Sequence, residues 1–321
     1  MLDSFATIMH SNPQKNQAEK DKGTIKSNLI CVFSILLFAM GFPAAEYLLD
    51  DWDVVSVITA RNVFSFILIF FIWLSIEGIQ EVKSAKWLKG FFIGVSGFGI
   101  GAFLILYLQS ITTPVIAALA VATMPVFAVS LEMLLDGRKM TFWFFFGVVL
   151  VLWGGYIASG ASLVESNIGF AILIGFLGVA LFAWGSRATV KNLPGMTTLG
   201  QVAVTSFGMA GLSIALYFIC TIFMDLTNSA TSITLKHLGL VLIYAWLGIS
   251  QILWIKAVSQ LGIGISSFHL NAVPFYVMFM LFLLGDSWIW HQAVGALIVI
   301  SGVILAQQKS SKKKAEFFEL P

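Results

Sequence analysis

The sequence predicts an all-α integral membrane protein with ten transmembrane helices, arranged as two inverted five-helix repeats. The chain is 59% hydrophobic and only 11% charged, and its mean hydropathy is +0.93. Soluble proteins carry roughly 25% charged residues, so a water-soluble core could not absorb this much apolar sequence. The apolar residues fall in ten runs close to the length of about 20 residues that a helix needs to cross a bilayer. The last five runs repeat the pattern of the first five.

The predicted spans follow one another closely along the chain. Their ranges are 28–48, 54–76, 88–110, 115–135, 141–159, 168–188, 198–224, 238–258, 264–284 and 290–307. The polar segment 1–27 lacks the apolar stretch of a cleavable signal, so we expect the first span to be retained. Cys31 and Cys220 both lie inside spans, which argues against a disulfide framework.

The positions of lysine and arginine predict that both termini are cytoplasmic. With the N-terminus inside, nearly all basic residues fall in or beside inner loops, as the positive-inside rule requires. They are Lys83, Lys86, Lys89, Arg138, Lys139, Arg187, Lys191, and Lys309, Lys312, Lys313 and Lys314 of the tail 308–321. The outer loops carry Asp50, Asp51, Asp53, Glu165, Asp225 and Asp286, with Lys236 as their one lysine. We expect the tail to anchor the topology at lipid head groups and not to bind nucleic acid.

A proline-bearing span and its successor give the clearest evidence of duplication. In the first copy Pro125 is followed by Gly147 and Gly154, and in the second Pro274 is followed by Gly295 and Gly302. The proline-to-glycine gaps are 22 and 21 residues, and each glycine pair is 7 residues apart. Five is an odd number of spans, so the second repeat enters the membrane from the opposite side. We therefore predict inverted repeats at 28–159 and 160–307, an arrangement from which alternating access arises in many secondary transporters.

Short motifs recur at equivalent places in the two repeats. Phe38-Ala39-x-Gly41 in the first span is echoed by Phe182-Ala183-Trp184-Gly185 in the sixth, and Arg61 stands in the second. With the proline spans, these motifs resemble the EamA-like ten-span group of the drug/metabolite transporter superfamily over nearly all of the chain after residue 28. Asp136-Gly137-Arg138 and Gly285-Asp286-Ser287 depart mildly from the Gly-Glu-Arg-like turn often found there. The resemblance implies one domain with a central cavity lined mainly by spans 1, 3, 4, 6, 8 and 9, and transport of metabolites or drugs, commonly outward.

The two prolines predict interruptions near the bilayer midplane. Pro125 and Pro274 each lie about ten residues into their spans, which is about 15 Å at 1.5 Å per residue. Each proline frees a carbonyl one turn earlier, at Val121 and Leu270. Either neighbouring helices satisfy two simple kinks, or the broken helices form a midplane site. The sequence leaves both interpretations open.

Charged and titratable residues inside spans need partners or water, since a charge at a helix centre costs about 2.5–3.5 kcal/mol. Arg61 leans towards the outer side, and we expect it to pair with Glu46 or to share a water network with it, in a structural role. Lys256 is expected either at the inner interface or facing an anionic group at the mouth of a cavity. His269 is expected to be a hydrogen-bonding packing residue, with proton coupling as the minority alternative.

Deep aromatic residues with polar neighbours predict a substrate cavity. Trp246, Ser250 and Trp254 follow one another at i, i+4 spacing, which places them on one face of a helix. Aromatic walls with polar edges suit a flat or aliphatic substrate. The candidate cavity residues are Tyr107, Thr123, Trp184, Tyr244, Trp246, Gln251, Trp254, Lys256, His269, Asn271 and Tyr276.

The sequence indicates neither a catalytic centre nor a built-in energy source. Its four histidines show no metal-binding spacing, and it has no phosphate-binding glycine loop, so we expect no metal, cofactor or ATPase activity. The leading hypothesis is a secondary transporter of amino acids or related polar metabolites in a bacterial inner membrane, with export as the expected direction. We expect a small-molecule substrate and membrane lipids as its partners, and no obligate protein partner.

Three other hypotheses remain open. The first is a multidrug exporter for cationic or aromatic compounds, although Glu46 is the one well-placed deep acidic residue and this argues mildly against cations. The second is an uptake carrier or exchanger, because alternating access runs in either direction. The third is a membrane scaffold or enzyme without transport, which would need neither an inverted repeat nor mid-span prolines.

Overall fold

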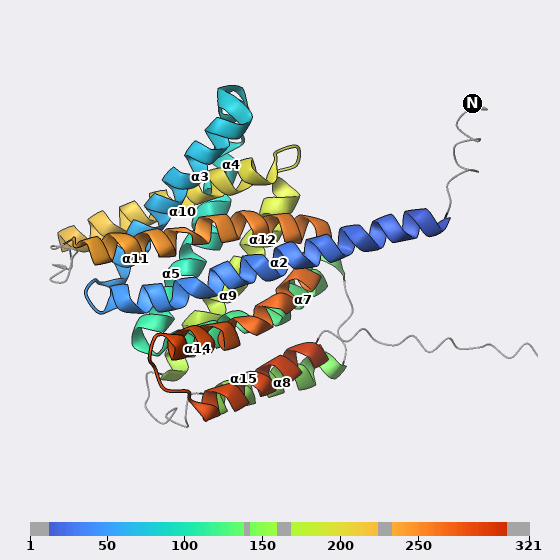
Figure 1. Ribbon diagram of the computed structural model, residues 1–321, viewed down its shortest axis with the longest axis vertical. Coiled ribbons are helices and arrows are strands. Elements are labelled where there is room, and N and C mark those ends of the chain that lie inside the picture. The colour runs from blue at the N-terminus through green and yellow to red at the C-terminus, as the bar shows by residue number, and fades with distance from the viewer. Residues whose placement is uncertain (1–12, 138–141, 159–167, 224–232, 307–321) are drawn as a thin grey trace, which may run out of the picture.

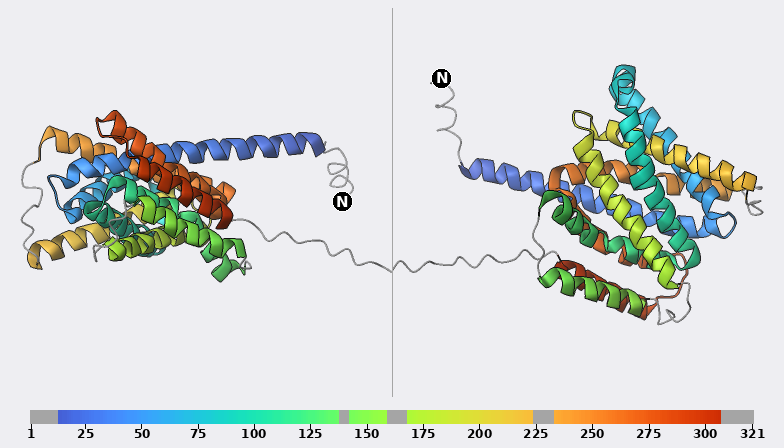
Figure 2. Two further views of the ribbon diagram at one scale, coloured as in Figure 1. Left: turned by 90° about the horizontal axis from the view of Figure 1, so that it is seen from below. Right: turned by 180° about the vertical axis from the view of Figure 1, so that it is seen from behind.

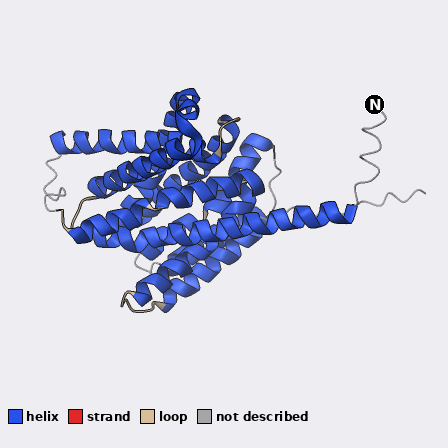
Figure 3. Ribbon diagram, turned by 45° about the horizontal axis from the view of Figure 1, so that its top comes forward, coloured by secondary structure: helices blue, strands red, loops and turns tan. Residues whose placement is uncertain are grey.

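The computed structural model describes residues 13–137, 142–158, 168–223 and 233–306, and within them it is helical and contains no strand (Figure 3). Eight helical segments in this described part are long and apolar enough to cross a membrane, and 142–158 and 290–305 are shorter apolar helices. The all-α membrane fold is thus confirmed. The ten apolar segments coincide with the ten predicted spans, although two of them fall below the usual spanning length.

Several of these segments consist of more than one helix (Figure 1). In chain order the helices are α2 (Pro13–Leu49), α3 (Val54–Ser84), α4 (Trp87–Ile93), the π-helix η1 (Gly94–Gly99), α5 (Ile100–Ile111), α6 (Pro114–Ala122), α7 (Met124–Asp136), α8 (Phe142–Ala158), α9 (Ile168–Asn192), α10 (Thr198–Phe223), α11 (Leu235–Ala245), α12 (Leu247–Leu261), α13 (Ile263–Phe268), the 3-10 helix η3 (His269–Ala272), α14 (Val273–Leu283) and α15 (Trp290–Ala306). The N-terminal part of α2 extends beyond the rest of the bundle (Figures 1 and 2).

Glycines set the antiparallel contact between α8 and α15, the last helix of each predicted repeat. A Cβ atom added at Gly154 would lie 2.8 Å from the carbonyl oxygen of Gly295, and one at Gly302 would lie 2.6 Å from that of Gly147. The first glycine of one repeat thus meets the second glycine of the other. Such crosswise pairing is what a two-fold axis between antiparallel helices produces, and it relies on the close backbone approach that small residues permit in membranes.

The repeated Phe-Ala-x-Gly motifs also occupy equivalent contacts. Gly41 on α2 packs against Leu247 at the start of α12, and Gly185 on α9 packs against Gly97 in η1. These contacts join the first span to the eighth and the sixth to the third, which are equivalent pairs under the predicted repeat. The boundary predicted at 159 and 160, like the tail 308–321, lies outside the described residues.

Both proline spans are broken immediately before the proline. The first is divided at Thr123 between α6 and α7, and Pro125 lies in the first turn of α7. The second is divided by η3, and Pro274 lies in the first turn of α14. A proline at the start of a helix is favourable because the missing N–H would have had no intrahelical partner. The chain therefore accommodates each proline by ending one helix and beginning another.

Candidate functional site

A pair of small adjoining cavities lies between the two halves of the bundle. Each has a volume of about 30 Å³, enough for one or two water molecules and too small for a metabolite. Phe38, Arg61, Ile105, Phe182 and Leu247 line both. We call the two together the central cavity. Its walls come from spans 1, 2, 3, 4, 6, 8 and 9, which adds span 2 to the set that the resemblance implied.

Arg61 on α3 is the cation of this cavity. Its side chain is only 6% exposed, and its Cζ atom lies 5.3 Å from the centre of the Tyr244 ring. The Nε atom is buried without a hydrogen-bond partner. No carboxylate is among the described residues that line the central cavity. The guanidinium group therefore has an aromatic face beside it but no counter-ion in the cavity wall, an arrangement that favours an anionic ligand.

The predicted direct pair of Glu46 and Arg61 does not form in this structure. Glu46 accepts a hydrogen bond of 3.2 Å from Nε2 of Gln109, while Arg61 faces Tyr244. Gln109 takes the place of Arg61 as the partner of Glu46. Its amide N–H groups donate to Glu46 and to the carbonyl of Phe42, and its side chain lines the same cavity as Arg61. Glu46 and Arg61 are thus connected only through Gln109 and the cavity.

The polar side chains of α12 line the same cavity. Ser250 exchanges two hydrogen bonds with Ser34 of α2, each hydroxyl donating to the other residue's carbonyl at 2.8 and 3.0 Å. Trp254 donates its indole N–H to the hydroxyl of Ser186 at 2.9 Å. Nε2 of Gln251 is buried without a partner. Of the predicted cavity residues, Tyr244, Gln251 and Trp254 therefore lie in the central cavity beside Arg61.

Phe38 and Phe182 line the cavity, although the sequence identifies them only as members of a repeated motif and not as cavity residues. Phe38 and Phe182 occupy the same position in the two Phe-Ala-x-Gly motifs, and their ring centres lie 6.5 Å apart. Both line the central cavity. The repeated motif marks the two phenylalanines as equivalent in the predicted repeats, but repetition alone does not show that they face a cavity.

The proline breaks also border the central cavity. Val121 and Leu270, each four residues before a proline, line the same part of it. They come from opposite repeats, so the two broken spans approach one region, as the sequence analysis expected for a midplane site. Thr123 belongs to the first break, but it faces a different cavity between α6, α8 and α9, and its hydroxyl bonds the carbonyl of Ala120 at 2.6 Å.

Four other predicted residues lie outside the cavity lining. Trp246 is 54% exposed and Lys256 is exposed as well. Tyr107 stacks on Phe103 with their ring centres 6.5 Å apart, and the ring of Trp184 packs beside Gly97. For Lys256 the outward position corresponds to the interfacial interpretation rather than to the inner mouth of a cavity.

The remaining predicted residues line a separate lateral groove of about 430 Å³ between α2, α14 and α15. His269, Asn271 and Tyr276 belong to it. His269 contacts the carbonyl of Ser266 through Nδ1 at 3.3 Å, and Oδ1 of Asn271 is buried without a partner. These three side chains therefore line a different space from Arg61, whereas the sequence predicts one cavity for the whole set.

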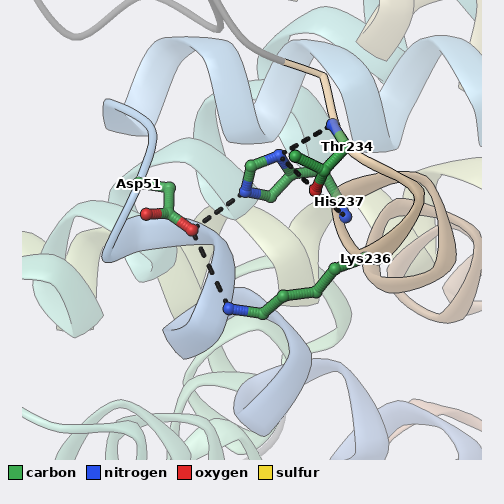
Figure 4. A network of polar contacts seen from close by, with 4 residues as sticks. All are labelled: Asp51, Thr234, Lys236 and His237. Carbon is green, nitrogen blue, oxygen red and sulfur yellow. Dashed lines mark hydrogen bonds and ion pairs between the residues drawn. The ribbon is translucent and has the colours of Figure 1, made fainter.

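The described residues contain no group of three His, Cys, Asp or Glu side chains that could hold a metal ion. A polar network lies at the end of the bundle where the end of α2 meets the start of α11. Nε2 of His237 lies 2.9 Å from Oδ2 of Asp51 (Figure 4). The ring of Trp52 packs against the imidazole, with 5.1 Å between ring centres. This network joins the α2–α3 turn to the start of α11.

The fold defines a multi-pass membrane protein, and comparisons with known proteins identify it as a transporter. Residues 25–160 match the EamA-like transporter family. The chain is 26% identical over 241 residues to the uncharacterized transporter YyaM of Bacillus subtilis strain 168, which covers 72% of this chain and 76% of that protein. A solved crystal structure has the same fold, with a TM-score of 0.62 over 88% of this chain and 96% of that chain, at 15% identity.

The family match over residues 25–160 and the similarity to YyaM fit the drug/metabolite transporter superfamily. This confirms the family that the repeated motifs indicated. The family match covers the first predicted repeat, while the similarity to the crystal structure extends over both.

Proposed function

We propose that this protein is a secondary transporter of small polar metabolites that carry a carboxylate group, such as amino acids, and that Arg61 binds this carboxylate. The observation that supports the substrate class is a buried guanidinium group in the central cavity with no acidic residue in the described cavity wall. A carboxylate can accept two parallel N–H donors from arginine, which gives both affinity and orientation. The sequence alone had favoured a purely structural role for Arg61.

The proposed mechanism is alternating access, with export across a bacterial inner membrane as the direction we favour. The central cavity is now too small for a metabolite, so binding requires the helices around it to separate. The broken spans at Pro125 and Pro274 supply the interrupted helices on which such a movement can be based. The two repeats lie in one chain, so a monomer suffices and no other protein is required.

A second candidate function is export of aromatic compounds. Phe38, Phe182 and Trp254 surround the cavity, and its surface is mainly apolar. Aromatic side chains of this kind hold flat apolar ligands as readily as the side chains of aromatic amino acids. Uptake or exchange is the alternative for direction, and a scaffold without transport is the least favoured hypothesis.

A thermal-unfolding screen of the purified protein against amino acids, nucleosides and cationic dyes distinguishes these functions. A ligand that binds the folded state raises the unfolding temperature. We expect stabilisation by one or more amino acids and a loss of affinity of about tenfold or more in Arg61→Gln, as for the loss of a charged hydrogen-bond pair. Lys256→Gln removes an exposed cation as a control and should leave the affinity unchanged. Stabilisation by hydrophobic cations alone would contradict the carboxylate proposal.

A further inference from the structure

A second polar space lies at the end of the bundle where α2 ends, separate from the central cavity. It has a volume of about 240 Å³ and opens between the start of α6, the end of α14 and the start of α15. Its polar lining includes Glu46, Thr113, Asp286, Trp288 and Gln292. We call this space the vestibule. In the predicted orientation it faces the outside of the cell.

The formal charges of the vestibule are all acidic in the described part of the chain. Glu46 and Asp286 line it, and no lysine, arginine or histidine does so among the described residues. The N-termini of α6 and α15 also border it, and each contributes a partial positive charge of about half a unit. The two carboxylates together carry more negative charge than the two helix N-termini supply in positive charge. The nearby C-terminus of α14 adds a further partial negative charge. The vestibule therefore favours a cation.

The side chain of Gln292 gives evidence for a ligand that does not depend on the acidic residues. It is only 6% exposed, it lines the vestibule, and no hydrogen bond joins it to any residue that the structure describes. Side-chain amides inside proteins are normally hydrogen-bonded. A hydrogen-bond donor in the vestibule would be a partner for the amide oxygen of Gln292.

We propose that the vestibule binds an organic ammonium group, held by Glu46, Asp286 and the amide oxygen of Gln292. An ammonium group has three N–H donors and no acceptor, so one acceptor from each of these three lining residues would complete its hydrogen bonding. The aromatic ring of Trp288 beside them adds a surface that favours cations. A volume of about 240 Å³ accommodates such a group together with a small organic body.

The vestibule communicates with the central cavity through one hydrogen-bonded pair. Glu46 lines the vestibule, and its partner Gln109 lines the central cavity with Arg61. This part of the inference rests on the proposed function: a zwitterionic substrate would present its ammonium group to Glu46 and its carboxylate to Arg61. An ammonium ligand of Glu46 would compete with Gln109 for the carboxylate oxygen and so open the partition between the two spaces.

Isothermal titration of the full-length protein with ethanolamine tests the vestibule alone, because ethanolamine carries an ammonium group and no carboxylate. We expect binding to the wild type and a loss of affinity of about tenfold in Asp286→Asn, the usual effect of losing one charged hydrogen bond. Asp286 lies on the exposed connection between α14 and α15, so the variant should fold. Asp50→Asn is the matched control, since Asp50 is an exposed acidic residue near Glu46 that does not line the vestibule.

The Arg61→Gln variant separates this inference from the proposed function. Ethanolamine should bind it as it binds the wild type, whereas the most stabilising amino acid of the thermal screen should bind both Arg61→Gln and Asp286→Asn more weakly. Absence of ethanolamine binding to the wild type, or equal binding to Asp286→Asn, would overturn the vestibule site. An amino acid that is insensitive to Arg61→Gln would overturn the proposed function and leave the ethanolamine result standing.

Discussion

Asp51 shows how one exposed carboxylate can hold two distant segments together. The backbone N–H of Thr234 donates to Nδ1 of His237 at 3.2 Å, so the opposite ring nitrogen, Nε2, carries the proton and donates to Asp51 (Figure 4). Nζ of Lys236 lies 3.9 Å from the same carboxylate oxygen. The hydrogen bond from His237, with the positive charge of Lys236, lowers the pKa of Asp51 below its ordinary value.

This lowered pKa predicts a stability difference that depends on pH. A carboxylate whose pKa is lower in the folded state stabilises the protein above its unfolded pKa of about 4, and the contribution disappears as the pH falls through the lower folded value. Asp51→Asn should therefore reduce the unfolding temperature slightly at pH 6–7, and the difference from the wild type should shrink below about pH 4. Unfolding temperatures of both proteins from pH 7 to pH 3 provide the measurement. A difference that grows on acidification would contradict the assigned pKa direction.

At the scale of the helices, tight contacts depend on which glycine faces a neighbour. Gly154 and Gly155 are consecutive on α8, yet a Cβ atom at Gly154 would lie 2.7 Å from the backbone nitrogen of Val299, while one at Gly155 would meet nothing within 4 Å. A methyl group at Gly154 must separate the backbones of α8 and α15. The same group at Gly155 has free space.

These neighbours give a matched pair of substitutions. Gly154→Ala should destabilise the protein by about 1–3 kcal/mol, the usual cost of overpacking. Gly155→Ala should be neutral or stabilising by up to about 1 kcal/mol, because alanine favours helix more than glycine does. Denaturation of both variants in detergent measures the difference. Equal effects of the two changes would show that the crosswise glycine contact does not determine stability.

The sequence predicted the helical segments well because long apolar runs and prolines are local signals. Which side chains face the cavity depends on how each helix is rotated about its own axis. A break between two helices changes this rotation for all the residues that follow. Trp246, Ser250 and Trp254 were expected on one face, but the chain breaks at Trp246 between α11 and α12. The change of rotation leaves Trp246 exposed and turns Ser250 and Trp254 inwards. No proline marks this break, so the sequence contained no signal for it.

At the scale of the whole molecule, the outside is apolar and the inside holds the polar groups. Phe71, Phe218, Phe223, Leu173 and Leu297 are all exposed, while Arg61, Gln109 and Gln251 are buried. This distribution suits a bilayer, in which apolar side chains face lipid. The family match ends at residue 160, whereas the similarity in fold to the crystal structure covers 88% of the chain.

The predicted orientation, with both termini inside, has a direct test. In a variant without Cys31 and Cys220, single cysteines at Asp50 and Ser84 place exposed thiols at opposite ends of α3. A membrane-impermeant maleimide applied to intact cells should label Asp50→Cys, and it should label Ser84→Cys only after permeabilisation. The reverse pattern would mean that the protein is inserted with its N-terminus outside.

The glycine crossing of α8 and α15 also has a consequence for movement. These two helices contact each other far more than they contact the rest of the bundle, and they lie together along one edge of it (Figure 1). Backbones that meet through glycines cannot slide past one another without steric overlap. If transport proceeds by the proposed alternating access, we expect α8 and α15 to keep their positions relative to each other while the helices around Arg61 move. Each predicted repeat ends in one of these two helices, so both repeats would move relative to the same pair.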